Sequence, residues 1–463
     1  MADLFGDMHA NIWRLLPSMD DDPLDDNSDT FLMLKKHHHT RRKLSRFIWT
    51  LLPSFVSAWF GHDKVGIPEA SSTSYLNGLR GIAALIVAIQ HNTNEYFPFN
   101  HRGYGDQPND THFTQLPFVR LILHGSFMVA IFFVISGFAL SYGPLKQIYA
   151  GNSSAAISGL PSSVFRRPIR LFLPILPVLI LSSIMIRLQI FYQLGAESFL
   201  AAQPSLTAEL TFMLKEFNTM IATAVGTQTM PQGWTISTEY RGSILIFLCC
   251  LSFCRTSPLI RILFVGAILC YQMYLAHWEL ALFLYGMILA DIRHMRAKME
   301  ELLGTSRKIV DVSTWVLFIA ALFFGGWPIY GNGGGSMWYN YFAWVPTGNV
   351  PQQRFWHSVS AMMLITSLEN LPALQKCLNW KPILYLGEIS YGLYLVHWMV
   401  GMNLFTKGLV IRLRSEGYAH LLAWAAGASI TFPLCFWVAD LHWRLVDQKT
   451  IKLTRWLKDK VGI

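Results

Sequence analysis

The chain has 463 residues and a formal net charge of +9, and 52% of its residues are hydrophobic. Only 14% are charged, against about 25% in soluble globular proteins, which excludes an ordinary soluble domain and indicates a membrane protein. A role in nucleic-acid binding would need a basic and aromatic module, and the sequence contains none.

Residues 1–70 differ in composition from the rest of the chain. An acidic run, MDDDPLDDNSD (19–29), precedes a basic run, KKHHHTRRKLSR (35–46). Neither run is apolar enough to bury a core, so we expect a largely disordered cytosolic extension. The apolar stretch at 46–60 is too short to span a bilayer and is interrupted by Pro53, which favours an interfacial helix.

From residue 76 onward, apolar blocks recur at close to the length of about 20 residues that a membrane-spanning helix needs. We therefore predict an all-α, polytopic membrane domain of about ten transmembrane helices over residues 71–445, followed by a basic cytosolic tail at 446–463. The predicted spans are 77–95, 118–141, 170–193, 239–254, 258–275, 277–291, 312–330, 354–371, 383–406 and 420–442.

The charge distribution predicts the orientation of these spans. If both termini are cytosolic, the inner loops hold most of the lysines and arginines, as the positive-inside rule requires. The outer loops then hold only Arg102, Lys215, Lys407, Arg412 and Arg414. We expect a multi-pass protein of the endoplasmic reticulum or another endomembrane, in contact with the lipid bilayer.

Two sequons follow from this orientation. Asn109 in NDT lies on the predicted outer side and is a candidate glycosylation acceptor, which would make the chain a glycoprotein. Asn152 in NSS lies on the predicted inner side and should stay unmodified.

The six cysteines lie in or beside apolar segments and form no CxxC pair or framework spacing. We interpret them as buried thiols rather than disulfides or metal ligands. The sequence shows no ligand cluster for a metal.

The first predicted span carries ionisable residues at both ends. In LNGLRGIAALIVAIQHN (76–92), Arg80 and His91 lie within about 20° of one helix face and roughly 16 Å apart along the axis. The small residues Ala84 and Ala88 occupy the same face between them. Intramembrane ionisable residues usually face a cavity, which predicts a polar path. The structural alternative is that Arg80 snorkels to the inner headgroups and His91 lies at the outer interface.

A second cluster, FRRPIRLFLP (165–174), places Arg167 and Arg170 three residues apart. Because proline is common in the first turn of a helix, Pro168 predicts that both arginines lie at a helix N-terminus and share one face. Backbone N–H groups and two guanidinium groups would together bind an anion such as phosphate there. The alternative is an ordinary basic flank on the cytosolic side.

Carboxylates at span ends form a third feature. In GWTISTEYRGSILIFL (233–248), Glu239 lies at the entry to an apolar run next to Arg241. It is either a functional carboxylate or the ion-pair partner of a nearby arginine. Asp291, at a span end before a basic loop, is predicted to form an ion pair.

A late segment, EISYGLYLVHW (388–398), carries Ser390, Tyr394 and His397 at i, i+4 and i+7, so the three share a helix face well inside a span. A hydrogen-bonded structural role explains His397 more simply than catalysis does. We expect Tyr394 and His397 to line a substrate site.

Together these segments resemble the acyltransferase 3 family of integral membrane acyltransferases. YLNGLRGIAALIVAIQHN (75–92) is similar to its first-helix signature, and FMVAIFFVISGFALS (127–141) to its phenylalanine-rich second helix. RPIRLFLP, GWTISTEY and ISYGLYLVHW resemble its Arg-x-x-Arg motif, its Trp and Glu segment and its late Ser-Tyr and His block. The resemblance covers roughly 75–445. In a common version of the family's first-helix motif, an acid stands at the position of Asn77. The N-terminal extension without a fused esterase-like domain resembles fungal members.

The resemblance implies an acyltransferase that moves an acetyl group from acetyl-CoA, as co-substrate and without a bound cofactor, to a hydroxyl. The family's invariant histidine corresponds to His91, its first-helix arginine to Arg80 and its arginine pair to Arg167 and Arg170. The glutamate of the Trp-containing segment corresponds to Glu239.

The chemistry of these residues is compatible with that reaction. A histidine with a pKa near 6.5 is suited to take the proton of a hydroxyl as it attacks a thioester, which makes His91 a candidate general base. The arginines are candidates for binding the CoA phosphates. Arg80 would serve either a phosphate or the developing oxyanion, and the sequence leaves both open.

The acceptor also stays open. We expect a small lipophilic alcohol of secondary metabolism, with a cell-surface glycan as the alternative. A solute transporter using the same polar face is a further alternative, but a cytosolic arginine cluster is a feature that a CoA-binding enzyme needs and a transporter does not.

Overall fold

The computed structural model describes residues 49–61, 66, 69, 71–303 and 307–462. The acidic and basic runs that we predict to be disordered lie outside these residues. The chain divides into two compact units, Met1–Lys64 and Val65–Ile463. The first unit contains the described helix α3 (Ser54–Trp59), which begins directly after Pro53.

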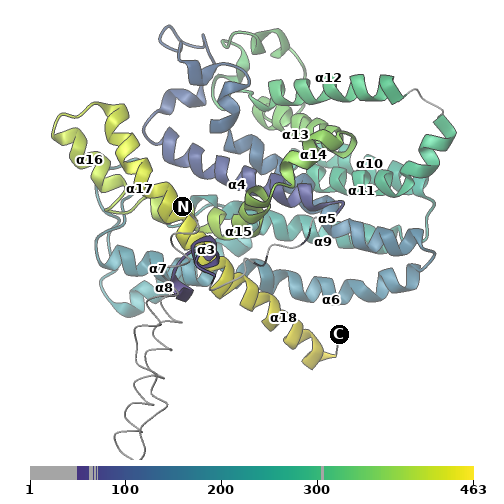
Figure 1. Cartoon of the computed structure of the whole chain (residues 1–463), viewed down its shortest axis with the longest axis horizontal. Coiled ribbons are helices and arrows are strands. Elements are labelled where there is room, and N and C mark those ends of the chain that lie inside the picture. The colour runs from purple at the N-terminus through teal and green to yellow at the C-terminus, as the bar shows by residue number, and fades with distance from the viewer. Residues whose placement is uncertain (1–48, 62–65, 67–68, 70, 304–306, 463) are drawn as a thin grey trace, which may run out of the picture. The chain divides into compact units, whose positions relative to one another are not determined.

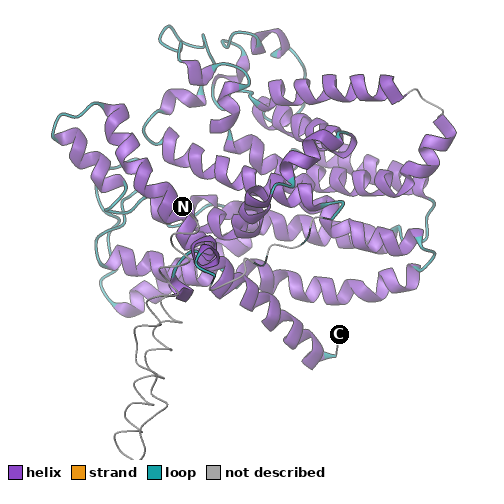
Figure 2. Cartoon of the chain, viewed as in Figure 1, coloured by secondary structure: helices purple, strands orange, loops and turns teal. Residues whose placement is uncertain are grey.

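The described part of the second unit is helical and contains no β-strand beyond isolated bridges (Figure 2). Its α-helices, most of them labelled in Figure 1, are α4 (Ser74–Asn94), α5 (Gly125–Tyr149), α6 (Ser153–Phe172), α7 (Ile175–Arg187), α8 (Leu206–Thr223), α9 (Trp234–Ser252), α10 (Pro258–Tyr274), α11 (Trp278–Leu303), α12 (Arg307–Gly325), α13 (Gln352–Asn370), α14 (Pro372–Leu378), α15 (Lys381–Gly401), α16 (Lys407–Ser415), α17 (His420–His442) and α18 (Gln448–Val461). Short 3-10 helices are η1 (Pro98–His101), η2 (Phe113–Gln115), η3 (Val119–Leu123), η4 (Pro231–Gly233), η5 (Gly331–Gly333) and η6 (Tyr339–Phe342), and a π-helix, η7 (Trp443–Asp447), joins α17 to α18.

Three helical stretches in the described residues are long and apolar enough to cross a membrane: Gly125–Tyr149, Ser153–Arg187 and His420–Val461. Two shorter apolar helices, Pro258–Tyr274 and Asp311–Gly325, coincide with two further predicted spans. The remaining predicted spans also fall on helices, namely α4, α9, α11, α13 and α15. The all-helical prediction is confirmed, whereas the number of ten membrane crossings stays a prediction.

Glycines allow two helix pairs to approach closely. A Cβ atom on Gly81 of α4 would meet the backbone of Gly387 in α15, and one on Gly137 of α5 would meet the backbone of Phe283 in α11. Small residues at such crossings let helix backbones pack directly against each other. The contact between α4 and α15 matters most for function, because these helices carry the polar residues singled out in the sequence.

The core is built around α5 and α11. Phe133 of α5 stacks on Phe283 of α11, with ring centroids 5.6 Å apart, inside a large apolar cluster. A second cluster joins α7, α15 and α17. The ion pair between α10 and α11 is buried: Arg261 of α10 donates to both carboxylate oxygens of Asp291 at 2.6 Å, which confirms Asp291 as an ion-pair residue.

The arginine pair lies at the other end of its helix from the end that the sequence predicts. Helix α6 begins at Ser153, where the Asn152 side chain accepts a hydrogen bond from the Ala155 N–H, and Pro168 lies inside it. Arg167 and Arg170 therefore lie in its last turns, where cations complement the helix dipole. The prediction of a helix N-terminus at these arginines is wrong, because an Asn cap starts the helix upstream in a segment that its polarity marks as a loop.

Two of the six cysteines also differ from their predicted burial. Cys249, Cys250, Cys254 and Cys435 are buried, but Cys270 and Cys377 are exposed, and all six are free thiols. Cys270 lies on α10, on which few residues are buried beyond Arg261 and Val265. A helix that packs through one face leaves the apolar residues of its other face exposed, which sequence hydropathy does not distinguish.

Candidate functional site

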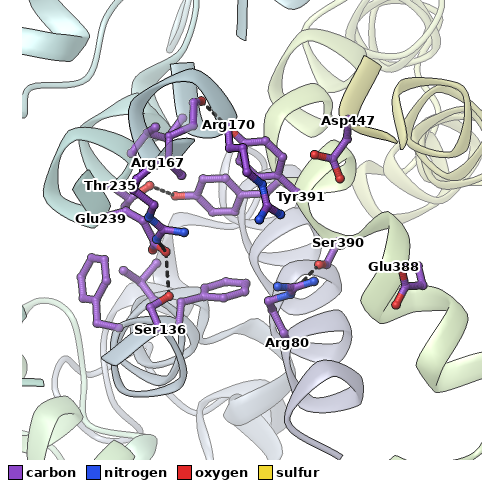
Figure 3. A pocket seen from close by; sticks show the side chains of 16 residues that line it. Arg80, Ser136, Arg167, Arg170, Thr235, Glu239, Glu388, Ser390, Tyr391 and Asp447 are labelled. Atoms are coloured by element: carbon purple, nitrogen blue, oxygen red, sulfur yellow. Dashed lines mark hydrogen bonds and ion pairs between the residues drawn. The ribbon is translucent and has the colours of Figure 1, made fainter. Parts of the chain in front are cut away.

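A cavity with an empty volume of about 950 Å³ opens between α4, α5, α6, α9, α15 and η7. Phenylalanine, leucine, isoleucine and valine side chains form its apolar walls. Figure 3 labels Arg80, Ser136, Arg167, Arg170, Thr235, Glu239, Glu388, Ser390, Tyr391 and Asp447 among the residues that line it. The three predicted arginines and Glu239 are thus brought together in one place from three helices.

Arg167 and Glu239 form an ion pair across the cavity wall. Arg167 Nη2 lies 2.6 Å from Glu239 Oε1, and Arg167 Nε donates to Ser243 Oγ at 2.7 Å. Ser136 Oγ donates to the same Glu239 oxygen at 2.7 Å. Charge-assisted hydrogen bonds of this kind are among the strongest in proteins. The pair links α6, α9 and α5, and the partner of Glu239 is Arg167 rather than its neighbour Arg241.

Arg80 is oriented by α15. Its Nε donates to Ser390 Oγ at 3.0 Å and its Nη2 to the Gly387 carbonyl at 3.2 Å. One turn earlier on α4, Asn77 Nδ2 donates to Glu388 Oε1 at 2.8 Å. These contacts hold the arginine in a fixed direction while its charge stays at the cavity surface (Figure 3).

Arg170 differs from Arg167 in its surroundings. Its side chain is exposed and its guanidinium group points into the cavity (Figure 3). Asp447 lies on the neighbouring wall, at the last position of η7. A π-helical turn widens the helix and is often found at functional sites. Here it brings a carboxylate from the C-terminal segment to the edge of the cavity.

Tyr394 closes the end of the cavity near the middle of α15. Its hydroxyl is 2.8 Å from Thr235 Oγ1, and it donates to the Gln232 carbonyl at 3.3 Å. On its far side, the ring centroid of Tyr394 lies 5.8 Å from that of His397. The side chain therefore stands between the large cavity and the histidines.

A second, smaller cavity lies at the C-terminal ends of α4 and α15, with about 260 Å³ of empty space when the solvent-open mouth is included. His91 and His397 both line it, and their rings stack with centroids 5.3 Å apart. The edge of Trp398 contacts His91 at a centroid distance of 5.6 Å. His91 and His397 thus line one cavity, and the three arginines and Tyr394 line the other.

The predicted polar path along α4 is divided rather than continuous. Arg80 lines the large cavity and His91 the small one. Ala84 between them is fully buried, and Ala88 is 3% exposed. Ala84 belongs to the apolar cluster that includes Leu393 and Val396 of α15, so packing between the two helices fills the space.

Several lining residues were missed in the sequence. Ser136 lies in the Ser-Gly-Phe block of the second helix, and this motif alone does not indicate the hydrogen bond from Ser136 to Glu239. Asp447 carried no signal, because it lies at the border of a segment that reads as a basic tail. Glu388 lay inside the late motif, and only the packing of α15 on α4 shows its contact with Asn77.

Comparisons with known proteins identify the family of the chain. The model of an acyltransferase domain family matches residues 73–440. The chain is 28% identical to the O-acetyltransferase PaAT-1 of Phomopsis amygdali over 83% of its length and 84% of that relative. It is 24% identical to the acyltransferase R4 of a Phoma species and 22% identical to the acyltransferase clz18 of Cochliobolus lunatus, in each case over 79% of this chain and 90% of the relative. No solved structure matches significantly. The chain therefore belongs to the acyltransferase 3 family of membrane acyltransferases.

Proposed function

We propose that this protein transfers an acetyl group from acetyl-CoA to a hydroxyl group of a small lipophilic molecule. The observation that carries the proposal is an arginine-lined cavity whose lining residue Tyr394 contacts His397 of a stacked histidine pair. A donor with anionic phosphates needs the arginines, and its reactive thioester end needs a base such as a histidine. The name O-acetyltransferase of one relative supports a hydroxyl acceptor.

The large cavity suits the donor. Arg170 is exposed, and Arg80 donates to a neutral hydroxyl and a carbonyl, so both guanidinium groups can meet phosphates. Arg167 is already engaged by Glu239, which favours a positioning role for that pair over direct phosphate binding or proton transfer by Glu239. The predicted orientation turns this cavity toward the cytosol, where CoA is made.

His91 is the proposed general base. As the acceptor oxygen attacks the thioester carbonyl, its proton passes to the His91 imidazole, and the carbon–sulfur bond then breaks. The departing CoA thiolate takes the proton back, so atoms and charges balance. Because His91 lies beyond Tyr394, the acetyl end of the donor has to pass that side chain. The position of Arg80 in the arginine-lined cavity favours a phosphate-binding role over an oxyanion-binding one.

A labelling experiment tests the proposal. Membranes containing the protein are incubated with acetyl-CoA labelled in the acetyl group and with an extract of the producing organism, and matched membranes without the protein serve as control. We expect an organic-soluble labelled ester and an equal amount of free CoA. Label in a water-soluble glycan would replace the lipophilic acceptor by a glycan, and solute uptake without CoA release would contradict an acyltransferase.

A further inference from the structure

The small cavity at the ends of α4 and α15 contains polar atoms that have no hydrogen-bond partner among the described residues. They are His397 Nε2, Trp398 Nε1 and Asn92 Oδ1. His397 is 4% and Trp398 5% exposed. Folded proteins rarely leave buried donors and acceptors unsatisfied, and such atoms beside a cavity indicate a missing ligand or water. All three belong to residues that line this one cavity.

The charges around this cavity are already balanced. Glu95, its only lining carboxylate, accepts a hydrogen bond from Lys407 Nζ at 2.6 Å and another from the Gly195 N–H at 3.3 Å. Lys407 is 4% exposed, so the pair is held inside the protein. An occupant with a net charge would meet no free counter-charge and would lose its hydration. The cavity therefore suits an uncharged molecule.

The unsatisfied atoms also define the chemistry of the occupant. The Trp398 indole N–H can only donate, and Asn92 Oδ1 can only accept. The free His397 Nε2 also accepts, because His397 Nδ1 lies 3.3 Å from the Leu393 carbonyl and therefore carries the ring proton. A hydroxyl group can accept a hydrogen bond from the Trp398 N–H and donate its own proton to one of the acceptors. A ketone or an ether can only accept, so it would leave the acceptors unsatisfied. The remaining wall, from Tyr96, Met402 and the ring of Trp398, is aromatic or apolar.

We propose that the small cavity is the acceptor site and that it binds the hydroxyl-bearing end of an uncharged, largely apolar alcohol between His91 and the unsatisfied atoms of His397, Trp398 and Asn92. This inference rests on the proposed function. It adds that donor and acceptor enter through different cavities and meet at Tyr394 and the histidine pair.

Gly401 gives a direct way to fill this cavity. It lines the cavity, its backbone has an ordinary φ, and a Cβ atom there would meet no atom within 4 Å. A Cβ at Gly401 therefore has open space around it, and we expect the Gly401→Leu side chain to reach into the cavity that Gly401 lines. Gly266→Leu in α10 is the matched control, because a Cβ atom at Gly266 also meets nothing within 4 Å and Gly266 does not line either cavity.

The test uses a twelve-carbon alkyl alcohol that carries a diazirine and an alkyne as a photo-crosslinking probe. Purified full-length protein in lipid nanodiscs is irradiated with it, and labelled peptides are mapped by mass spectrometry. We expect labels within 91–96 and 397–402, competed by unlabelled dodecanol but not by dodecane. Gly401→Leu should remove most of this labelling, and Gly266→Leu should leave it at the wild-type level.

A second variant keeps the proposal testable if Gly401→Leu does not fold. Trp398→Phe keeps an aromatic ring and removes the N–H donor, and we expect probe affinity to fall about three- to tenfold. Binding of acetyl-CoA should be unchanged in both variants, because the arginine-lined cavity is untouched. Labels that map to the arginine-lined cavity, or labelling that neither variant weakens, would overturn the acceptor site.

The probe also separates this inference from the proposed function. If the mapped labelling is as expected but no acetyl group is ever transferred from acetyl-CoA, the alcohol site stands and the proposed function fails. If acetyl transfer occurs and the probe maps elsewhere, the function stands and the acceptor site is wrong.

Discussion

Arg167 Nη2 lies 2.6 Å from Glu239 Oε1, whereas the guanidinium group of Arg170, three residues later on α6, points into the open cavity (Figure 3). The two arginines of one motif therefore have different surroundings and, we expect, different tasks. Arg167 joins three helices through Glu239, Ser243 and Ser136. Arg170 is available to a ligand.

Substitution of each arginine by alanine should separate these tasks. Arg167→Ala leaves Glu239 without its ion-pair partner, and we expect a loss of about 1–3 kcal/mol in stability, measured as a lower unfolding temperature in detergent. Arg170→Ala should keep the wild-type unfolding temperature and raise the KM for acetyl-CoA by about 10- to 100-fold. Equal effects of both substitutions on KM, with no difference in stability, would contradict this division.

Asp447 places a negative charge where the proposed donor brings its phosphates. Asp447→Asn removes the repulsion and leaves Arg170 and Arg80 unchanged, so we expect the KM for acetyl-CoA to fall severalfold, most clearly at low salt. Asp459→Asn, an exposed position on α18 with the same change in charge, is the control and should have no effect. A raised KM in Asp447→Asn would instead indicate that this carboxylate binds the donor directly.

The orientation can be tested at the two sequons. Both Asn109 and Asn152 are exposed. Which of them is glycosylated therefore depends on the side of the membrane on which it lies and not on its accessibility. We expect a glycosidase-sensitive mass shift that Asn109→Gln removes and Asn152→Gln does not. A shift that depends on Asn152 would invert the predicted topology.

The loop that carries Asn109 contains a pH-dependent contact. Asp110 is fully buried. Burial raises its pKa, but hydrogen bonds from Arg102 at 2.7 and 3.0 Å and from Gln115 at 3.0 Å outweigh this and hold the pKa below its usual range. Since the folded pKa is lower than the unfolded value of about 3.9, the stabilisation is present above that pH and is lost as the pH falls through the folded pKa.

Asp110→Asn should therefore lower the unfolding temperature at pH 7, and its difference from wild type should shrink below about pH 4. The neighbouring Asp106 is the contrasting variant. Burial and the charge of Asp110 raise the pKa of Asp106 above its usual range, so its ionised form is disfavoured in the fold. We expect Asp106→Asn to unfold at or above the wild-type temperature. A difference between Asp110→Asn and wild type that stayed constant from pH 7 to pH 3 would contradict this account.

The helical fold could be predicted from the sequence, and so could five of the ionisable residues that line the cavities, because apolar blocks and ionisable residues within them are local signals. These residues are Arg80, His91, Arg167, Arg170 and Glu239. The helix that carries Arg167 and Arg170 was misplaced, since the Asn152 cap starts α6 in a segment of small and polar residues. The partner of Glu239 could not be predicted, because it depends on which helices pack together.

The separation into two cavities could also not be predicted from the sequence. Periodicity places Arg80 and His91 on one face of α4, and they do lie on the side that faces α15. Whether the space between them is open depends on the volumes of Leu393, Val396 and their neighbours. These residues belong to another helix, so the periodicity of α4 alone does not show that they fill the space. The π-helix that brings Asp447 to the cavity has no sequence pattern that would have distinguished it from continuous α-helix.

We propose His91 as the base in an acetyl transfer from acetyl-CoA. The most direct test is the rate of label transfer from acetyl-CoA to the organic-soluble product by His91→Gln, compared with His277→Gln, a half-exposed histidine outside both cavities. We expect His91→Gln to bind acetyl-CoA normally and to lose about 10²- to 10⁴-fold in rate, and His277→Gln to match wild type. Transfer by His91→Gln at the rate of the control would contradict the account.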